Sequence, residues 1–337
     1  MQTYCRKLII FYMAVNALPV VASGEPQALS NITELSVVSL NMHGFQQSCE
    51  FLVGMCASCQ FDLIHVQEHW LNDVNMHKLA AVSPDYIMYG ESAMNNVTSR
   101  DVLVGRPYGG CATLVKCELA SVTECRLMTD RIVALAIAGS LFVNLYLPCE
   151  DSEVARELTI DILASVAAVI NDDYYDYVFI GGDMNTDLNR NRKHAAIVRD
   201  FLSAHDMSFC KLGNSMQYTY SNEKSVSYST IDFWCLSSVI MQYVSLYSTI
   251  DSAICFSDHL PIRLLVALPA DNSLARGLSK CQVMFRGKTK QSGRGAGAHG
   301  RPSEYTSKEV SYRLRFDHCN HASYYELTGT YDSVNTE

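Results

Sequence analysis

A buried strand that ends in two glycines and a carboxylate is the feature that most constrains how this chain can fold. Residues 177–180 read Tyr-Val-Phe-Ile, a β-branched and aromatic run typical of a buried strand. Gly181 and Gly182 would let the backbone turn tightly at this point. Asp183 and Asn185 would then lie two positions apart on the new loop. The pattern predicts a functional site at a sheet edge if other strands deliver matching polar groups, and otherwise an ordinary exit from a strand.

The rest of the chain alternates short strands with helical stretches. Short apolar runs predict strands at residues 35–40, 62–66, 110–116, 131–138, 141–147, 230–236, 239–247 and 260–268. Apolar positions at helical spacing predict helices at residues 45–58, 152–170 and 192–203. Many hairpin-like strands with few helices predict a mixed α/β (α+β) fold, in which two β-sheets pack together and helices flank them.

Composition divides the chain into three parts. Residues 1–32 contain an apolar run at 8–21, which has the outline of a secretory signal but also fits a plain extension ahead of the domain. Residues 33–268 form the expected globular domain. Residues 269–337 are expected to form a basic flexible linker with a short helical segment at 312–325. No segment is long and apolar enough to span a membrane.

The thirteen cysteines bear on the compartment. Their number is odd and the only close pair is Cys56-x-x-Cys59, so neither a disulfide framework nor a zinc ribbon is expected. This usage favours a reducing intracellular compartment, nuclear or cytoplasmic. If the leader is a real signal, the protein is secreted. In that case Asn31 and Asn96, each in an Asn-x-Thr triplet, become glycosylation acceptors.

Charge is unevenly distributed along the chain. The formal net charge is −9, yet ten Lys and Arg but only two Asp and Glu residues lie between Arg276 and Arg315. The acidic remainder is a poor general binder of nucleic acid, because phosphate contacts need cations. It suits a site that holds a divalent metal, and a polyanion would bind through that metal and a local basic patch.

Polar residues suited to such a site recur where apolar runs end. They come from separate strands, at the C-terminal end of an apolar run or just beyond it: Asn41, Glu68, Tyr146, Asp183, Asn185, Asp232, Asp258 and His259. Each alone has a plain interpretation, since a single histidine is more often structural than catalytic. Coincidences of position and chemistry in six segments favour an assembled site.

Six sequence blocks carry a resemblance to a known family. In chain order they are Leu-Asn-Met-His-Gly at 40–44, Gln-Glu-His-Trp-Leu at 67–71, Asn-Leu-Tyr-Leu-Pro at 144–148, Gly-Gly-Asp-Met-Asn at 181–185, Ser-Thr-Ile-Asp-Phe-Trp at 229–234 and Ser-Asp-His-Leu-Pro at 257–261. They resemble the signature blocks of the endonuclease/exonuclease/phosphatase superfamily and span nearly all of residues 35–268. The resemblance implies a four-layer sandwich of two packed β-sheets flanked by helices, and metal-dependent cleavage of a phosphoester.

Tyr146 and the C-terminal segment narrow the resemblance. Secreted deoxyribonuclease-type members and the lipid and inositol phosphatases have histidine at the position of Tyr146. Tyrosine followed by Leu-Pro is similar to the apurinic-endonuclease and retrotransposon branch. Residues 312–318 and 323–329 are similar to the segment that joins endonuclease to reverse transcriptase in invertebrate non-LTR (LINE-type) elements. Because the chain stops at Glu337, with no reverse transcriptase domain, it resembles the endonuclease end of a truncated element.

Two residues depart from the pattern of the repair endonucleases. His43 lies where those enzymes usually have an acid near the metal, and Cys149 lies where they often have asparagine. Both departures argue against specificity for abasic sites, and neither affects the expected cleavage set.

The resemblance implies Mg²⁺ as the cofactor, with Mn²⁺ as an alternative. Glu68 is the expected hard-oxygen ligand, with Asn41 nearby as a neutral ligand or phosphate contact and Asp258 in the outer shell. Phosphodiester hydrolysis also needs a positioned water molecule and stabilised phosphoryl charge. Asp183 is expected to orient and deprotonate the water, and Asn185 to hold the water or a phosphoryl oxygen.

Three further residues complete the expected site. His259 would contact the scissile phosphate, where an imidazolium is a good donor to an anion. Asp232 would fix the tautomer of His259 and raise its pKa. Tyr146 would act as a neutral hydrogen-bond donor to the phosphate. The residues leave open which group is the acid and which the base, and whether one or two metals bind.

The leading hypothesis is a DNA endonuclease that nicks one strand and leaves a 3′-hydroxyl. One alternative is a secreted or other phosphoesterase of the same fold, motivated by the leader. A second is an inactive relic whose basic tail binds nucleic acid, against which the intact set of site residues argues. The sequence does not define the oligomeric state.

Overall fold

The computed structural model describes residues 32–281, apart from gaps at 95–97, 100–101, 104–105, 150–151, 213–217 and 223–224, and also the backbone of strands β17 (Glu309–His318) and β18 (His321–Thr330). Contacts divide the chain into two compact units, Met1–Lys288 and Thr289–Glu337, and each is described by itself. The apolar leader and both Asn-x-Thr asparagines lie outside the described residues.

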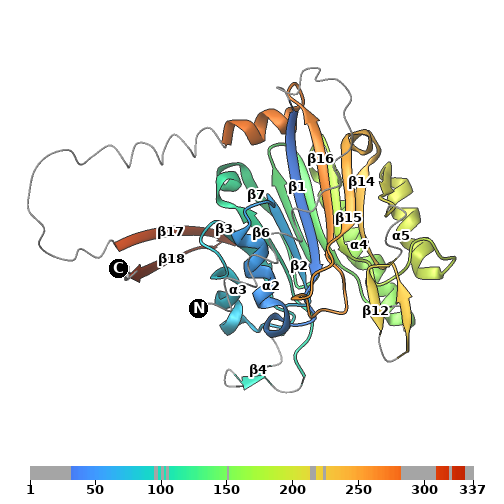
Figure 1. Ribbon diagram of the computed structural model, residues 1–337, viewed down its shortest axis with the longest axis horizontal. Coiled ribbons are helices and arrows are strands. Elements are labelled where there is room, and N and C mark those ends of the chain that lie inside the picture. Colours follow the sequence, from blue (N-terminus) through green and yellow to red (C-terminus); the bar gives the residue numbers. More distant parts are fainter. Residues whose placement is uncertain are drawn as a thin grey trace, which may run out of the picture. The chain divides into compact units, whose positions relative to one another are not determined.

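Two six-stranded β-sheets lie at the centre of the first unit (Figure 1). The strands of the first sheet are, in spatial order, β15 (Val244–Thr249), β16 (Ile262–Pro269), β1 (Ile32–Asn41), β2 (Leu63–Gln67), β6 (Cys111–Lys116) and β3 (Tyr86–Glu91). Those of the second are β11 (Met207–Phe209), β14 (Asp232–Ser237), β10 (Val178–Asp183), β9 (Ser140–Tyr146), β8 (Ile132–Ile137) and β7 (Thr123–Met128).

A parallel pair in the middle of each sheet decides where the strands end. β1 and β2 run parallel, as do β9 and β10, while β1 pairs antiparallel with β16 and β10 pairs antiparallel with β14. Parallel neighbours end at the same edge of a sheet, and an antiparallel neighbour begins there. The last residues of β1, β2, β9 and β10 therefore meet the first residues of β14 and β16.

Helices cover the outer faces of both sheets (Figure 1). α2 (Phe45–Ala57) and α3 (Met76–Ala80) pack on the first sheet, and α4 (Glu153–Asp172) and α5 (Lys193–Ala204) pack on the second. The largest cluster of buried apolar side chains lies between the two sheets and includes the stacked rings of Phe142 and Phe179. The predicted four-layer α/β sandwich is confirmed.

α4 illustrates why these segments form helices at these positions. The Oγ of Ser152 accepts a hydrogen bond from the backbone N–H of Ala155, which satisfies a donor at the start of the helix. Ile162, Leu163 and Val166 are buried against the second sheet, and their spacing is that of one helix face. The helical period seen in the sequence therefore corresponds to the face that packs.

Shorter elements complete the first unit. They are the strands β4 (Thr98–Ser99), β5 (Val102–Leu103), β12 (Tyr220–Asn222) and β13 (Ser227–Ser229) and the 3₁₀ helices η2 (Asp73–Asn75), η3 (Cys117–Val122) and η4 (Ser238–Tyr243). The single strand expected at residues 239–247 divides into η4 and β15. None of the helices in the described residues is long and apolar enough to cross a membrane.

Gly181 and Gly182 do not form the expected tight turn, because both lie inside β10. A Cβ on Gly181 would lie 2.5 Å from the ring of Trp234, which fills the space between the sheets. A Cβ on Gly182 would lie 1.8 Å from the backbone oxygen of Leu145, and its φ of 154° is one that other residues rarely adopt. The two glycines allow close approach of neighbouring groups, and the turn begins after Asp183.

The chain beyond residue 268 differs from a flexible linker in two places. Residues 273–281 are helical, and Leu274, Ala275 and Leu278 are buried in the cluster between the sheets, so this helix belongs to the first unit. The helical segment expected at residues 312–325 is wrong, since the backbone there forms the antiparallel pair β17 and β18. Apolar residues at every second position, Tyr312, Leu314 and Phe316, have the period of a strand, and this signal was overlooked.

Candidate active site

Three of the expected site residues lie side by side across the second sheet. Asp183, the last residue of β10, pairs in register with Tyr146 at the end of β9 and with Asp232 at the start of β14. Residues directly opposite each other on neighbouring strands project from the same face. Asp232 therefore begins a strand, and it does not close one as the sequence pattern suggested. Antiparallel pairing brings it to the edge where the other two end.

Asn41, in the first sheet, bonds to the middle one of these three residues of the second sheet, Asp183. Asn41 is the last residue of β1 and is buried. Its Nδ2 donates to Asp183 Oδ2 at 3.0 Å and to Glu68 Oε1 at 3.2 Å. The side-chain amide of Asn41 thus links the two sheets at the site.

Glu68 follows β2 in a conformation that other contacts hold in place. Its φ is 51°, in the left-handed region that is uncommon for glutamate. Tyr146 OH donates to Oε1 at 2.9 Å, and Trp70 Nε1 donates to Oε2 at 3.1 Å. With the bond from Asn41, the carboxylate accepts three hydrogen bonds, which fix its orientation.

Asn185 fixes the orientation of Asp183 through two hydrogen bonds and is itself anchored by a third. Its backbone N–H donates to Asp183 Oδ1 at 2.8 Å, and its Nδ2 donates to Asp183 Oδ2 at 3.1 Å and to the backbone oxygen of Leu147 at 2.8 Å. The Sγ of Cys149 lies 3.0 Å from Asn185 Oδ1 and donates to it. Cys149, which departs from the pattern of the repair endonucleases, therefore contacts Asn185, an expected catalytic residue.

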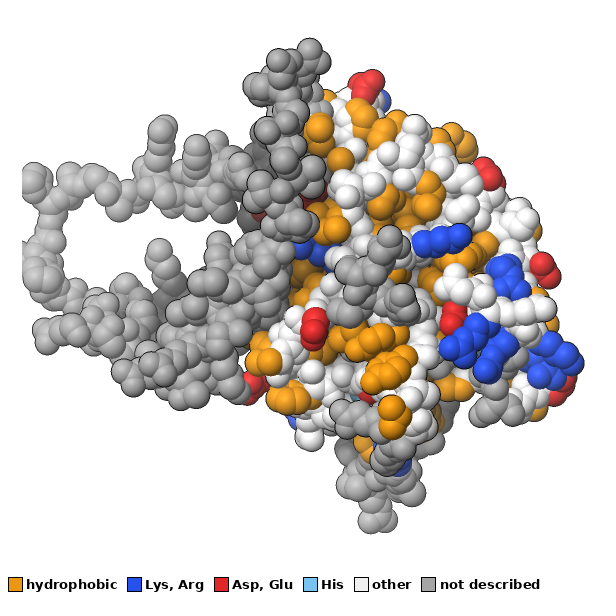
Figure 2. All heavy atoms as spheres, turned by 45° about the vertical axis from the view of Figure 1, so that its right-hand side comes forward, with side chains coloured by type: hydrophobic (Ala, Val, Ile, Leu, Met, Phe, Trp, Pro, Cys, Tyr) orange, Lys and Arg blue, Asp and Glu red, His pale blue; other side chains and the backbone are white. Residues whose placement is uncertain are grey.

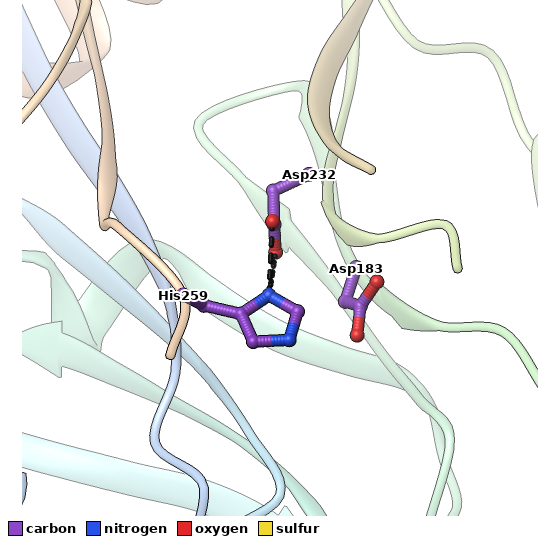
Figure 3. Close-up of side chains that lie close together, drawn as sticks. All are labelled: Asp183, Asp232 and His259. Carbon is purple, nitrogen blue, oxygen red and sulfur yellow. Dashed lines mark hydrogen bonds and ion pairs between the residues drawn. The ribbon is translucent and has the colours of Figure 1, made fainter. Parts of the chain in front are cut away.

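His259 and Asp232 form a buried pair (Figure 3). The Nδ1 atom of His259 lies 3.1 Å and 3.0 Å from the two carboxylate oxygens of Asp232, and Asp183 lies beside the same ring. Burial lowers the pKa of His259, but the carboxylates of Asp232 and Asp183 outweigh it and raise the pKa to about 10. His259 therefore carries a positive charge at neutral pH.

The neighbouring acidic groups are shifted as well. Burial raises the pKa of Asp183 to about 7, and the carboxylate of Asp232 acts in the same direction, whereas His259 opposes both. Burial, followed by the carboxylates of Glu68 and Asp183, raises the pKa of Tyr146 far above its usual range. At neutral pH, Tyr146 is a neutral hydrogen-bond donor, and Asp183 can exchange a proton.

Asp258 lies at the margin of this network and approaches it through His43. Its Oδ1 lies 3.0 Å from Nδ1 of His43, and it faces the same cavity as Glu68 and His259. Asp258 and His259 precede β16, so this segment also lies at the beginning of a strand and not at the end of one. The Oγ of Ser257 anchors it, donating to the backbone oxygen of Asn41 at 2.7 Å.

Two groups of residues could hold a divalent ion. Asp183, Asp232 and His259 offer ligand atoms within 4.8 Å of one another, the one such group of three in the described part of the chain. Asp232 and His259 already bind each other, however, so an ion there would displace their hydrogen bonds. Glu68 with Asn41 fits Mg²⁺ better, because Mg²⁺ takes one or two protein oxygens and completes its shell with water. Both groups consist of the donor types that such ions accept.

The site opens into two cavities that share residues. A cavity of about 530 Å³ contains Glu68, Asn185 and His259 and extends to Arg190 and Arg192. A second, of about 450 Å³, extends to Gln47, Arg106 and Phe256. The residues that line both are His43, Tyr220 and Asp258. The open surface therefore continues beyond the expected catalytic residues in two directions.

The sequence pattern did not single out several residues that hold the site. Trp70 positions Glu68, and its place two residues after Glu68 in the Gln-Glu-His-Trp-Leu block was a usable signal. Thr219 had no such signal, because it acts from 13 residues away: its Oγ1 accepts from the backbone N–H of Asp232 at 3.0 Å. Arg190 and Arg192 read as ordinary helix-start residues until the fold places them in the cavity.

Two six-stranded sheets that present carboxylates, amides and a His–Asp pair along one shared edge define a class of α/β-sandwich hydrolases. The chain belongs to the Endonuclease/Exonuclease/phosphatase family, whose pattern matches residues 38–259. Members of this family are hydrolases that act on phosphodiester bonds, typically with a divalent metal.

Solved structures share this fold at low sequence identity. AP endonuclease LMAP from Leishmania major is 12% identical with a TM-score of 0.54, covering 80% of this chain and 99% of its own. The endonuclease domain of TRAS1, a telomere-specific non-LTR retrotransposon, is 12% identical with a TM-score of 0.51, covering 69% and 98%. The 3′ phosphatase NExo from Neisseria, bound to a product DNA hairpin, is 12% identical with a TM-score of 0.51, covering 68% and 98%. No curated protein sequence matches this chain.

Proposed function

We propose that this chain is a divalent-metal-dependent endonuclease that nicks DNA and leaves a 3′-hydroxyl. The observation that carries the proposal is the position of Asp183. It bonds to Asn41 of the first sheet, and its ligand atom lies within 4.8 Å of those of the paired Asp232 and His259. A proton acceptor is thereby held beside a buried cation, which is the arrangement that attack on a phosphodiester requires.

Asp183 is the proposed acceptor of the proton from the attacking water. With a pKa of about 7 it is ionised in a substantial fraction of molecules at neutral pH and can still take up a proton. The water oxygen bonds to phosphorus, and the bond between phosphorus and the 3′-oxygen breaks. The products carry a 5′-phosphate and a 3′-hydroxyl. Asn185 keeps the carboxylate oriented throughout.

His259 and Tyr146 are the proposed donors to the phosphoryl oxygens. With Nδ1 held by Asp232, the other ring nitrogen of His259 is left to donate to an anion. Tyr146 stays protonated and donates without carrying charge. A divalent ion held by Glu68, with Asn41 and Asp258 nearby, would add positive charge next to the phosphoryl and leaving oxygens.

The two cavities support DNA as the substrate and an internal bond as the target. A terminal phosphate needs only one pocket, whereas an internal phosphodiester continues on both sides of the scissile bond. Arg190 and Arg192 line one cavity and Arg106 lines the other. Each cavity therefore offers a cation for the DNA phosphates on one side of the scissile bond. Figure 2 shows Lys and Arg side chains gathered at the right of the face drawn, the side where Figure 1 places α5. An acidic chain can bind a polyanion through such a local patch.

The 3′-hydroxyl polarity is proposed from the resemblance of the tyrosine-containing block at Tyr146 to the retrotransposon branch. The fold shared with the TRAS1 endonuclease domain supports it. The described cysteines are all free thiols, which supports work in a reducing intracellular compartment.

A nicking assay tests the proposal. The protein with Mg²⁺ is expected to convert supercoiled plasmid to the open-circular form, and a DNA polymerase is expected to extend from the nick. Asp183→Ala and chelation by EDTA are each expected to stop conversion. A chain that ends after Lys288 retains the helix at 273–281 and should still nick, which separates catalysis from the basic tail. Nicking by Asp183→Ala at the wild-type rate, or ends that the polymerase cannot extend, would overturn the proposal.

A further inference from the structure

Two buried amide side chains lie directly behind the candidate active site. Gln67 is the last residue of β2 and immediately precedes Glu68. Asn144 lies two residues before Tyr146, the last residue of β9. Both amides are completely buried, between sheets whose facing surfaces are mainly apolar. Burying an amide costs free energy unless hydrogen bonds replace those it makes with water.

Hydrogen bonds of these two amides join the two sheets. Gln67 Nε2 donates to Asn144 Oδ1 and also to Ser39 Oγ of β1, the latter at 2.9 Å. Asn144 Nδ2 donates to the backbone oxygens of Val66 at 3.1 Å and Ala112 at 2.7 Å. All four N–H groups of the two amides are therefore used. The side chain of Asn144, from the second sheet, reaches the backbone of β2 and β6 in the first.

The Gln67–Asn144 pair constrains the two strands more tightly than apolar contacts do. Apolar burial is non-directional, so side chains of the right size can pack between two sheets in more than one alignment. Hydrogen bonds weaken steeply as their angles change, and a buried amide that loses its partner bears the cost of desolvation. The pair therefore favours one alignment of β2 with β9.

The two strands carry residues with roles in the proposed mechanism. Glu68 follows β2 and Tyr146 ends β9, and Tyr146 OH donates to Glu68 Oε1 at 2.9 Å. Glu68 has a φ of 51°, which glutamate rarely adopts by its own preference, so its position depends on surrounding contacts. The bonds of Gln67 are one residue away from Glu68, and those of Asn144 are two residues away from Tyr146.

A second link between the sheets makes the influence of the pair local. Nε1 of Trp234, in β14, donates to the backbone oxygen of Ile262, in β16, at 3.3 Å. Both residues belong to the apolar cluster between the sheets. Loss of the Gln67–Asn144 pair is therefore expected to leave the sheets packed and to change how β2 and β9 lie against each other near the site.

We propose that Gln67 and Asn144 are positioning residues, whose hydrogen-bonded pair sets the separation of Glu68 and Tyr146. The inference rests on the proposed function for the roles of Glu68 as metal ligand and Tyr146 as donor to the phosphate. The pair then sets the spacing between the divalent ion and that donor. Because neither amide reaches the substrate, the pair acts on the rate of bond cleavage and not on the affinity for DNA.

Apolar replacements of similar shape, Gln67→Met and Asn144→Leu, test the pair. Misplacement of catalytic groups by about 1 Å can cost roughly 100-fold, so single-turnover nicking at saturating DNA should slow by roughly 10–100-fold in each variant. Affinity for duplex DNA, measured in Ca²⁺, should change by less than about threefold, since the expected phosphate contacts lie elsewhere. Equal losses in rate and in affinity would contradict a role in positioning.

Thr159→Val is the matched control for the loss of a buried hydrogen bond. Thr159 is buried, and its Oγ1 donates to the backbone oxygen of Ala155 at 2.9 Å and bonds to Nε2 of His194 in α5. Its loss should lower the melting temperature about as much as Gln67→Met or Asn144→Leu does, and it should leave the nicking rate unchanged. Rate losses no greater than that of Thr159→Val would reduce the pair to a contribution to stability.

Exchange of the two amides provides a rescue. Gln67→Asn shortens one side chain by a methylene group, and Asn144→Gln lengthens the other by the same amount. Each single variant should nick slowly, whereas the double variant keeps the summed length and should recover about tenfold in rate. A double variant as slow as the slower single variant overturns the pairing.

The indole N–H signals of the two tryptophans give a readout that needs no catalysis. Trp70 Nε1 donates to Glu68 Oε2, and Trp234 Nε1 reports on the packing between the sheets. In Gln67→Met and Asn144→Leu, the NMR signal of Trp70 is expected to shift while that of Trp234 stays. An unmoved Trp70 signal overturns the proposal. A shifted Trp70 signal in a chain that does not nick DNA supports the positioning and defeats only the proposed function.

Discussion

Asn41 Nδ2 donates a hydrogen bond of 3.0 Å to Asp183 Oδ2, across 142 residues of sequence and between the two sheets. The same amide group donates to Glu68 Oε1. One neutral donor thus separates two carboxylates that would otherwise repel each other, and it places the proposed base next to the proposed metal ligand.

Replacing that donor by a carboxylate should change the pH dependence of nicking. Burial and Asp232 raise the pKa of Asp183 to about 7, and the base must be ionised to accept a proton, so the rate should rise with pH through about 7. It should then stay level until His259 loses its proton near pH 10. Asn41→Asp adds a like charge and should move the rising limb to higher pH by roughly one unit or more. Single-turnover nicking measured from pH 5 to pH 10 checks this, and an unmoved limb would contradict it.

Asp183→Asn should lower activity and raise stability. Loss of the proton acceptor is expected to slow nicking by roughly 10²–10⁴-fold. The folded-state pKa of Asp183, about 7, lies above the ordinary value of 3.8 that applies in the unfolded chain. Ionisation of Asp183 therefore destabilises the fold, with no effect below pH 3.8 and the full effect above about pH 7. At pH 8 the variant should therefore melt at least about 2 °C higher than the wild type. Asp161→Asn on the exposed face of α4 is the control. If its melting temperature rises equally, the gain does not come from removing the buried charge of Asp183.

Glu68→Gln should raise the concentration of metal needed for nicking. A neutral amide keeps the size of the side chain but offers one oxygen in place of a carboxylate, and loss of the charge should weaken binding by roughly 10–100-fold. The half-maximal Mg²⁺ concentration, measured after the protein has been stripped with EDTA, reports the effect. Glu157→Gln, on the exposed surface of α4, should behave as wild type. Equal Mg²⁺ requirements in the wild type and Glu68→Gln would remove Glu68 from the metal site.

Arg190→Gln and Arg192→Gln should weaken DNA binding in a salt-dependent way. A lost phosphate contact reduces the slope of log affinity against log salt by about 0.9, so each variant should lower the slope by roughly one. Binding of duplex DNA between 50 mM and 200 mM salt, in Ca²⁺ to prevent cleavage, measures this slope. Lys280→Gln lies on the helix at 273–281, away from the cavity, and should not change it. Slopes equal to that of the wild type would place the DNA elsewhere.

Gly181→Ala should destabilise the packing between the sheets. The added Cβ would lie 2.5 Å from Trp234, and overpacking of this kind typically costs about 1–3 kcal/mol. Trp234→Phe removes part of the ring that the Cβ meets, so Gly181→Ala should cost less in that background. Urea unfolding of the two single variants and the double variant measures the difference. Additive costs would mean that the Trp234 ring is not what Gly181 accommodates.

Local sequence patterns predicted a large part of this architecture. Apolar runs with glycine boundaries located β10 and its neighbours, and helical spacing located α4, because these signals depend on residues near each other in the chain. The six sequence blocks also identified the polar residues that the structure gathers at one edge. Their catalytic roles remain predictions, and the experiments above address them.

Other features depend on contacts that no local pattern contains. Asp232 and His259 were expected at the ends of strands. Asp232 instead begins β14 and His259 precedes β16, and the antiparallel pairing of these strands brings both residues to Asp183. The pair β17 and β18 is a different case, because the alternation of apolar and polar residues from Tyr312 to Asp317 is a local strand signal that the expected helix overlooked.

The amino-acid sequence by itself determined the fold class, the family and the types of polar side chain at the site. Tertiary structure decided the rest: that Gly181 is required by Trp234, that Asn41 separates Asp183 from Glu68, and that Asp258 binds His43. Each of these is a distance between groups far apart in sequence. Such distances are set by how the two sheets pack, which involves the whole core at once.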